Sequence, residues 1–278
     1  MRWIPGYLSS VRLRRVSLVL ALMLPSSCFA DGAKTALIVD DGTAFDVNTV
    51  EAFLSGRLVN AGYTVTTNNG IPVGSLAAYT QVWDIRFQNN TPLTNSDITA
   101  YLTYLTGGGA LFALGENSSF ITRDNSILAL ITAAGGGSAA VLQNANSANM
   151  QTAQAPFTGP VSLTTLTFAA IGAFSSFGNA RLVTVDGTGL AGGIVFPPGS
   201  LTNATAGTLI SILDVNFLTS GVGSSQPLTD NLIAYLATPA PIAPLTPTPA
   251  PPTLLLMVAA IGALGLYETR RRWRMGER

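Results

Sequence analysis

The sequence predicts one domain of the α/β class, built on a doubly wound, mostly parallel sheet with an antiparallel, Gly- and Thr-rich extension. Two observations predict this fold. In the first half of the chain, short runs of β-branched and aliphatic residues alternate with helical patterns, which is typical of parallel sheets covered on both faces. In the second half, from residue 135 to 207, Gly, Thr, Ser and Asn dominate and only short apolar runs remain, which favours antiparallel strands added at one edge.

The parallel part begins with a strand over residues 34–39, the turn sequence Asp-Asp-Gly, and a helix whose apolar residues recur at helical spacing until Gly62. A second helix is predicted over 94–105, where Thr94 and its neighbours can cap the first turn. The triple glycine at 107–109 ends it. The remaining strands of this part are predicted over 63–67, 82–87 and 110–114.

The antiparallel extension is predicted from short segments that show few helical patterns and contain β-branched residues. These runs cover residues 161–168, 180–186 and 193–196. A continuous apolar run over 208–214 then predicts a buried strand that returns to the parallel sheet, and a helix over 228–236 closes the domain.

Composition excludes several classes of function. The chain has no histidine, and its single cysteine is Cys28, so a domain beginning after Ala30 has no Ser-His-Asp triad, Cys-His pair, imidazole ligand or thiolate. The formal net charge is zero, but residues 31–238 carry five basic and twelve acidic residues, a net charge of −7. We therefore expect no nucleic-acid or anionic-lipid binding, and contacts with cations or neutral sugars instead.

The N-terminal residues predict export. Three arginines precede an apolar stretch over 16–24, Pro25 interrupts it, and small residues follow, which predicts a signal peptide over 1–30 cleaved between Ala30 and Asp31. An uncleaved anchor and a lipoprotein site at Cys28 are the alternatives, although nine apolar residues are short for a membrane span.

The C-terminal residues form three segments. Seven prolines lie within 239–253, which predicts an extended linker. An apolar run over 254–267 predicts a transmembrane helix, and the arginine-rich residues 268–278 predict a cytoplasmic tail. The exported domain thus extends over 31–238 and lies outside the cytoplasm.

This layout resembles the PEP-CTERM and IPTL-type sorting signals of Gram-negative bacteria, over residues 247–274. The resemblance implies an exosortase-type membrane protease as partner, a link to exopolysaccharide, and delivery to the cell surface or medium. Processing would occur around Pro251, Pro252 and Thr253, where that family shows Pro-Glu-Pro or Ile-Pro-Thr-Leu. Permanent membrane anchoring is the alternative.

Residues 79–117, with a Trp-Asp-Ile-Arg-Phe strand, a helix, a triple glycine and a Leu-Phe-Ala-Leu-Gly-Glu-Asn strand end, resemble the class I glutamine amidotransferase-like fold. The resemblance extends over 34–133 and 208–237. Catalytic members carry a cysteine in the turn after the strand that corresponds to 110–114, whereas this chain has Gly115-Glu116-Asn117 there. The resemblance therefore implies the scaffold without glutaminase activity, and we expect a non-enzymatic protein.

Ligands of open parallel sheets bind outside the carboxyl ends of the strands, and polar residues follow the predicted strands here. Ion pairing of Arg86 with Asp84, Asp41 or Glu116 is one interpretation, and a Ca²⁺ or Mg²⁺ site with carboxylate and amide ligands is the second. In the third, two carboxylates act as acid and base on a glycosidic bond, which requires a separation of about 5 to 9 Å. The candidate ligand- or cation-binding residues are Asp41, Asp84, Arg86, Glu116, Asn117 and Asp214.

A polar loop is predicted over residues 117–125, directly after the strand at 110–114. Its amide, hydroxyl and charged groups could hydrogen-bond a sugar, with Trp83, Phe87 or Phe120 as the stacking surface. The sequence thus predicts an exported surface or matrix protein with a non-catalytic domain, or alternatively a module that binds a polysaccharide or a divalent cation.

Overall fold

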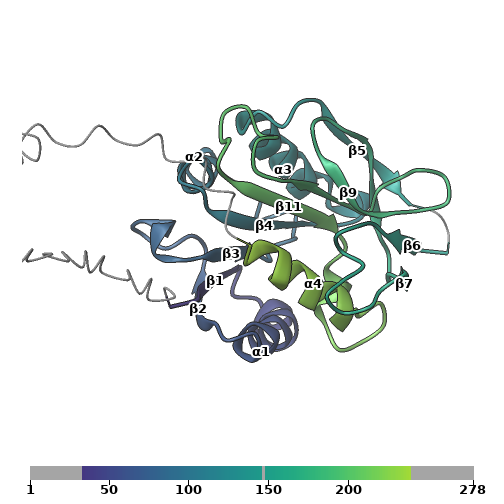
Figure 1. Ribbon diagram of the computed structural model, residues 1–278, viewed down its shortest axis with the longest axis horizontal. Coiled ribbons are helices and arrows are strands. Elements are labelled where there is room, and N and C mark those ends of the chain that lie inside the picture. The colour runs from purple at the N-terminus through teal and green to yellow at the C-terminus, as the bar shows by residue number, and fades with distance from the viewer. Residues whose placement is uncertain (1–32, 146–147, 239–278) are drawn as a thin grey trace, which may run out of the picture. The chain divides into compact units, whose positions relative to one another are not determined.

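A computed structural model describes residues 33–145 and 148–238 (Figure 1). Within these residues, nine strands form one sheet in the order β2-β1-β3-β4-β11-β10-β9-β6-β7. The first five strands in this order run parallel to one another. Each of the other four strands pairs antiparallel with the strand before it in the order. The predicted doubly wound sheet with an antiparallel extension is therefore confirmed.

The strands are β1 (Thr35–Asp40), β2 (Thr64–Asn69), β3 (Gln81–Asp84), β4 (Ala110–Gly115), β5 (Ala139–Asn144), β6 (Met150–Ala153), β7 (Thr165–Thr167), β8 (Gly172–Phe177), β9 (Arg181–Val185), β10 (Gly193–Phe196) and β11 (Thr208–Leu213). The α-helices are α1 (Ala52–Asn60), α2 (Asn95–Thr106), α3 (Ile121–Ala133) and α4 (Gln226–Leu236). A π-helix, η1 (Asp46–Glu51), leads into α1, and short 3-10 turns are η2 (Leu76–Ala78), η3 (Ser118–Phe120) and η4 (Val215–Leu218). Strands β5 and β8 form a separate antiparallel pair.

The parallel strands are hydrophobic on both faces, and each face has its own core. Alternate strand residues such as Ile38 and Phe112 pack with α1 and α4, whereas their neighbours such as Val39 and Leu111 pack with α2 and α3. The period-two alternation of a strand produces this division. Figure 1 shows α1 and α4 side by side below the sheet and α2 and α3 beyond its other face.

Several predicted helix boundaries follow from capping chemistry. The hydroxyl of Thr94 accepts a hydrogen bond from the N–H of Asp97, and the Asp97 carboxylate accepts one from the N–H of Thr94, which forms a capping box. The N–H groups of Gly107 and Gly108 bond to the last carbonyl oxygens of α2, and Gly108 has φ +88°, where a side chain would be strained.

The prediction for residues 117–125 is wrong. These residues form η3 and the first turn of α3, so the segment is mostly helical and not a loop. The predicted run over 161–168 is also shorter in the structure, because only Thr165–Thr167 pair as a strand.

The predicted signal peptide, linker, transmembrane helix and tail lie outside the described residues, as do the processing residues Ala30, Asp31, Pro251, Pro252 and Thr253. Within residues 33–145 and 148–238, no helix is long and apolar enough to cross a membrane.

Candidate functional site at the carboxyl ends of the parallel strands

The strand order reverses at β1, which has β2 on one side and β3 on the other. The segments leaving β1 and β3 therefore run to opposite faces of the sheet, toward α1 and α2 respectively. Such a reversal opens a crevice at the carboxyl ends of the two strands, where ligands of this kind of sheet bind. The candidate site is thus the end of β1 and β3 together with the adjoining ends of β4 and β11.

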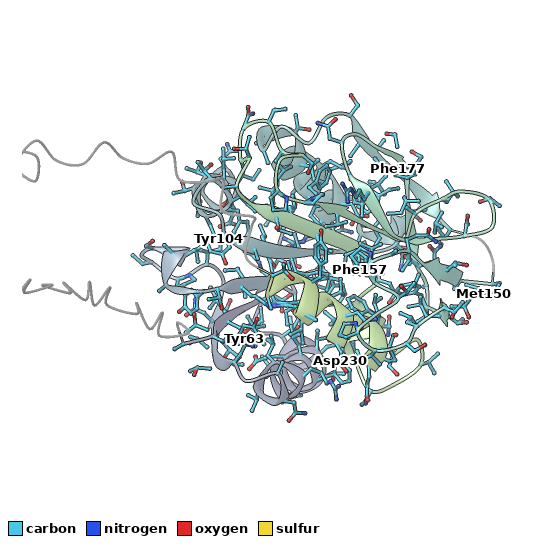
Figure 2. The ribbon with its side chains drawn as sticks, in the orientation of Figure 1. Tyr63, Tyr104, Met150, Phe157, Phe177 and Asp230 are labelled. Atoms are coloured by element: carbon cyan, nitrogen blue, oxygen red, sulfur yellow. The ribbon has the colours of Figure 1, made fainter. Side chains whose placement is uncertain are left out.

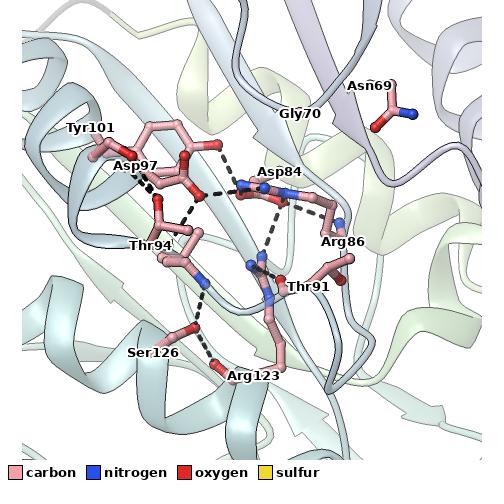
Figure 3. A network of polar contacts seen from close by, with 12 residues as sticks. Asn69, Gly70, Asp84, Arg86, Thr91, Thr94, Asp97, Tyr101, Arg123 and Ser126 are labelled. Carbon is pink, nitrogen blue, oxygen red and sulfur yellow. Dashed lines mark hydrogen bonds and ion pairs between the residues drawn. The ribbon is translucent and has the colours of Figure 1, made fainter.

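Asp84, at the end of β3, is fully buried between two arginines (Figure 3). Arg86 donates from Nε to Asp84 Oδ1 at 3.0 Å and from Nη2 to Oδ2 at 2.6 Å. Arg123 approaches from α3, with its Nη2 3.0 Å from Oδ1, and the hydroxyl of Tyr101 donates to Oδ2 at 2.8 Å. Burial alone would raise the pKa of Asp84, but Arg123 and Arg86 hold it at about 2. Asp84 is therefore an ionised carboxylate with its oxygens already bound.

The two arginines are fixed by further contacts. Arg123 is completely buried and also donates to the carbonyl oxygens of Leu114 and Thr91, at 3.1 and 3.2 Å. Arg86 has a second ion pair with Asp97 at 3.4 Å. The network joins β3, β4, α2 and α3, so its role is to hold these elements together. The expected pairing of Arg86 with Asp84 is thus found, whereas neither Asp41 nor Glu116 contacts Arg86.

Glu116 and Asp214, at the ends of β4 and β11, are buried and bind main-chain N–H groups. Glu116 accepts from the N–H of Val215 at 2.7 Å, and from the N–H and side-chain amide of Asn117 at 2.9 and 2.6 Å. Asp214 accepts from the N–H groups of Ala170 and Asn216 at 2.9 and 2.6 Å. Burial raises the pKa of Glu116 to about 8, against the opposing effect of these donors.

These contacts join the loops that leave β4 and β11. Glu116 bridges the two strand ends, and the N–H of Glu116 itself donates to Asp124 Oδ1 at 3.0 Å. Since both oxygens of Glu116 and both of Asp214 accept internal hydrogen bonds, neither side chain is presented to a substrate. Both carboxylates therefore hold the loops after β4 and β11 in place.

Asp41 and Asp46 form the part of the site in which carboxylate oxygens lack partners. Asp46 is fully buried, and neither of its oxygens has a hydrogen-bond donor among the described residues; the same holds for Asp41 Oδ2. Burial, with the neighbouring charge of Asp41 next, raises the pKa of Asp46 to about 8. The sequence prediction missed Asp46, because an acidic residue in the first turn of a helix normally interacts with the helix N-terminus.

An aromatic group lies beside these residues. Phe87 contacts Phe45 edge-on at 5.9 Å between ring centroids and Phe120 at 5.4 Å. Phe45 is 41% exposed, whereas Phe87 is 6% exposed. Trp83 is completely buried against Phe112, so the prediction that it could stack on a sugar is wrong. Phe45, which the prediction did not include, is the exposed ring of this group.

The polar groups expected on the 117–125 loop are used internally. The Asn117 side chain caps η3 by accepting from the N–H of Ser119, and Asn144 Oδ1 accepts from the N–H and hydroxyl of Ser118. Arg123 and Asp124 are buried in α3. The segment therefore offers few free donors to a sugar.

Two other observations limit the chemistry of the site. Within the described residues, no three Asp, Glu, His or Cys side chains are grouped so that they could hold a metal ion. The hollow of about 470 Å³ lined by Lys34, Tyr63 and Asp230 lies between the ends of α1 and α4, near the amino end of β1 and away from the candidate site. Figure 2 labels Tyr63 and Asp230 on that side of the molecule.

No protein family and no curated protein matches the sequence. Among solved structures, the N-terminal domain of mmIFT52 is similar, with a TM-score of 0.55 and 14% identity over 73% of this chain and 97% of that one. A putative ThuA-like protein from Parabacteroides merdae ATCC 43184 has a TM-score of 0.47 and 12% identity, over 74% of this chain and 90% of that one. A glutamine amidotransferase from Thermotoga maritima has a TM-score of 0.42 and 8% identity, over 65% and 75%.

The similar structures thus include a glutamine amidotransferase. At these identities the likeness concerns the fold alone. Activity and binding have to be argued from the residues of this chain, because one fold carries many functions.

Proposed function

We propose that this chain is an exported surface or matrix protein whose α/β domain binds and does not catalyse. The hydrogen bonding of Glu116 is the observation that supports a domain without catalytic activity. It stands in the turn after β4, where catalytic amidotransferase-like proteins have a cysteine nucleophile, and both of its oxygens accept hydrogen bonds from within the chain. With no histidine in the sequence, no general base of the usual kind is present to activate a nucleophile.

A carboxylate-based hydrolase is disfavoured by the same contacts. Asp84 is neutralised by two arginines, and Asp214 accepts two main-chain hydrogen bonds. A glycosidase needs one carboxyl group that is protonated and free to donate to the leaving oxygen, and a second that is open to the sugar or to water. An activity that survives Glu116→Ala would argue against a hydrolase based on Glu116.

Export and surface display are supported by the two ends of the sequence. The signal-like residues 1–30 and the proline, apolar and arginine segments of 239–278 support a proposal in which the domain lies outside the cytoplasm and an exosortase-type protease processes the tail. Adding a protease to intact spheroplasts tests this topology. We expect the domain to be degraded while a cytoplasmic marker survives; protection of the domain until lysis would contradict the proposal.

Polysaccharide binding at the Phe45 ring is the second candidate function. Phe45 is exposed, is held edge-on by Phe87, and lies at the carboxyl end of the sheet, and an exposed ring can stack on a sugar. The domain charge of −7 favours a neutral glycan over an acidic one. We expect Phe45→Ala to weaken retention on exopolysaccharide from the producing organism. Val59→Ala, an exposed apolar residue on α1, is the matched control and should leave retention unchanged.

A further inference from the structure

A hollow of about 470 Å³ lies where α1 and α4 end, near the amino end of β1 (Figure 2). Apolar side chains from both helices line it together with Val161, which is 39% exposed. The ion pair of Arg57 with Asp230 forms one side of the hollow and adds no net charge there. A hollow of this size, with apolar walls and few polar groups, is typical of a binding site.

The free polar groups that line the hollow include two hydrogen-bond donors. The Oε1 of the buried Gln81 accepts from Trp83 Nε1 at 3.0 Å, so the Nε2 of Gln81 faces the other way. This Nε2 donates to the carbonyl oxygen of Ile233 at 2.9 Å and to the hydroxyl of Tyr63 at 2.6 Å. The Tyr63 hydroxyl is therefore an acceptor in that bond, and no described residue accepts its own proton. Lys34, with its Nζ 5.7 Å from the centroid of the Tyr63 ring, has no ion pair with a described residue.

The chain itself supplies an occupant with matching chemistry. Ala237 lines the hollow, and the proline-rich residues 239–253 begin two positions later. This segment carries no charged residue, and because proline has no N–H, it presents carbonyl acceptors and few donors. Pro241, Pro244 and Pro247 recur at every third residue, which is the repeat of a polyproline II helix and places them along one edge of it. An apolar, acceptor-rich segment therefore starts beside an apolar hollow that offers donors.

We propose that residues 239–244 dock into this hollow in the polyproline II conformation. Proline-rich segments bind apolar grooves that contain an aromatic residue, because their extended conformation is already formed in the free chain and little entropy is lost. Tyr63 is the aromatic residue of this hollow. Because the segment is tethered beside its site, its effective concentration is on the order of 1 mM, so a weak interaction is enough to keep the hollow filled.

Docking fixes which end of the domain lies next to the tail. The hollow is near the amino end of β1, whereas Phe45 follows the carboxyl end of that strand. With the tail in a membrane, as proposed above, residues 245–253 remain as a spacer of about 28 Å, and Phe45 lies on the end of the domain that is turned away from the membrane. The docking itself does not require export or glycan binding, so each proposal can fail without the other.

The test measures the distance between the segment and the domain in the full-length chain, purified in detergent. Cys28→Ser removes the single cysteine, and spin labels are attached at Val47→Cys and Ala243→Cys. Val47 is 37% exposed and lies thirteen residues before Asn60, about 20 Å along the helical stretch that ends at the hollow. Double electron–electron resonance then gives the distribution of distances between the two labels.

Two tryptophan substitutions fill the hollow, and a third is their control. Ala234→Trp fills it from α4, and Asn60→Trp fills it from the exposed end of α1, which preserves the test if Ala234→Trp does not fold. Val59→Trp is the matched control, because Val59 is also exposed at the end of α1 but does not line the hollow.

We expect one narrow distance peak in the labelled parent and in Val59→Trp, and loss of that peak to a broad distribution in Ala234→Trp and Asn60→Trp. The peak should persist when labelled protein is diluted with an excess of unlabelled chain. A parent distribution as broad as those of the two variants with a filled hollow would overturn the proposal, as would a narrow peak that survives in both of them. A peak that disappears on dilution would place the segment in the hollow of a second copy and would equally overturn it.

Discussion

Replacing Asp46 with asparagine should make the protein more stable at neutral pH. Asparagine has nearly the same shape as a protonated aspartic acid, but it carries no charge and its amide can donate to Asp41. In the wild type, burial and the charge of Asp41 raise the pKa of Asp46 from 3.8 to about 8. The folded protein therefore keeps a proton at pH 7 that the unfolded chain releases, and this difference favours unfolding.

The sign and the size of this stability difference follow from the pKa values of Asp46 in the folded and in the unfolded protein. Between about pH 4 and pH 8 the unfolded chain binds fewer protons than the folded one, so wild-type stability falls as the pH rises, and it levels off above pH 8. One pKa unit corresponds to about 1.4 kcal/mol, which gives a cost of about 4 kcal/mol at pH 7 relative to a neutral side chain. Below pH 4 the two proteins should be equally stable.

Urea denaturation at pH 4, 5.5, 7 and 8.5 measures this difference. We expect the free energy of unfolding of Asp46→Asn to exceed that of the wild type increasingly with pH. Asp230→Asn is the control, because Asp230 is partly exposed and paired with Arg57. If Asp46→Asn is less stable than the wild type at pH 7, or if the difference does not change with pH, then Asp46 is not a buried carboxyl group without a partner.

Two further predictions concern the scaffold. Asp84→Ala leaves two buried guanidinium groups without their shared carboxylate and should lower the free energy of unfolding by about 3 to 5 kcal/mol in urea denaturation; a loss under about 1 kcal/mol would contradict the network. Gly207→Ala places a Cβ 2.5 Å from the carbonyl oxygen of Leu105 and should cost about 1 to 3 kcal/mol, seen as a lower Tm. Gly56→Ala, on the exposed face of α1 with nothing within 4 Å, should instead stabilise by about 0.5 to 1 kcal/mol, and equal effects of the two substitutions would refute the packing argument.

Local chemistry made much of the fold predictable from the sequence. The apolar runs of the first half correspond to strands buried on both faces, and Thr94 caps α2 as its sequence position suggests. The return of the 208–214 run to the parallel sheet follows from its unbroken hydrophobicity, because only a strand covered on both sides buries every residue.

The errors arise where charged residues are buried. Residues 117–125 are polar enough to be interpreted as a loop, but Arg123 is drawn inward by Asp84, a partner on a strand that is distant in sequence. Such a pairing is visible only once the sheet order is known. The same holds at the site. Asp84 and Glu116 lie at strand ends, as the sequence predicts, whereas the burial of both Asp46 oxygens depends on how distant parts of the chain pack around them.

The central claim is that the domain is exported and then displayed or released through its C-terminal tail. Intact mass spectrometry of the protein recovered from the producing cells and their medium tests it most directly. The account predicts a chain that begins at Asp31 and ends near Thr253. A chain that begins at Asp31 but keeps residues 254–278 in the membrane would replace sorting with permanent anchoring. A chain that retains residues 1–30 and is found in the cytoplasm would contradict export itself.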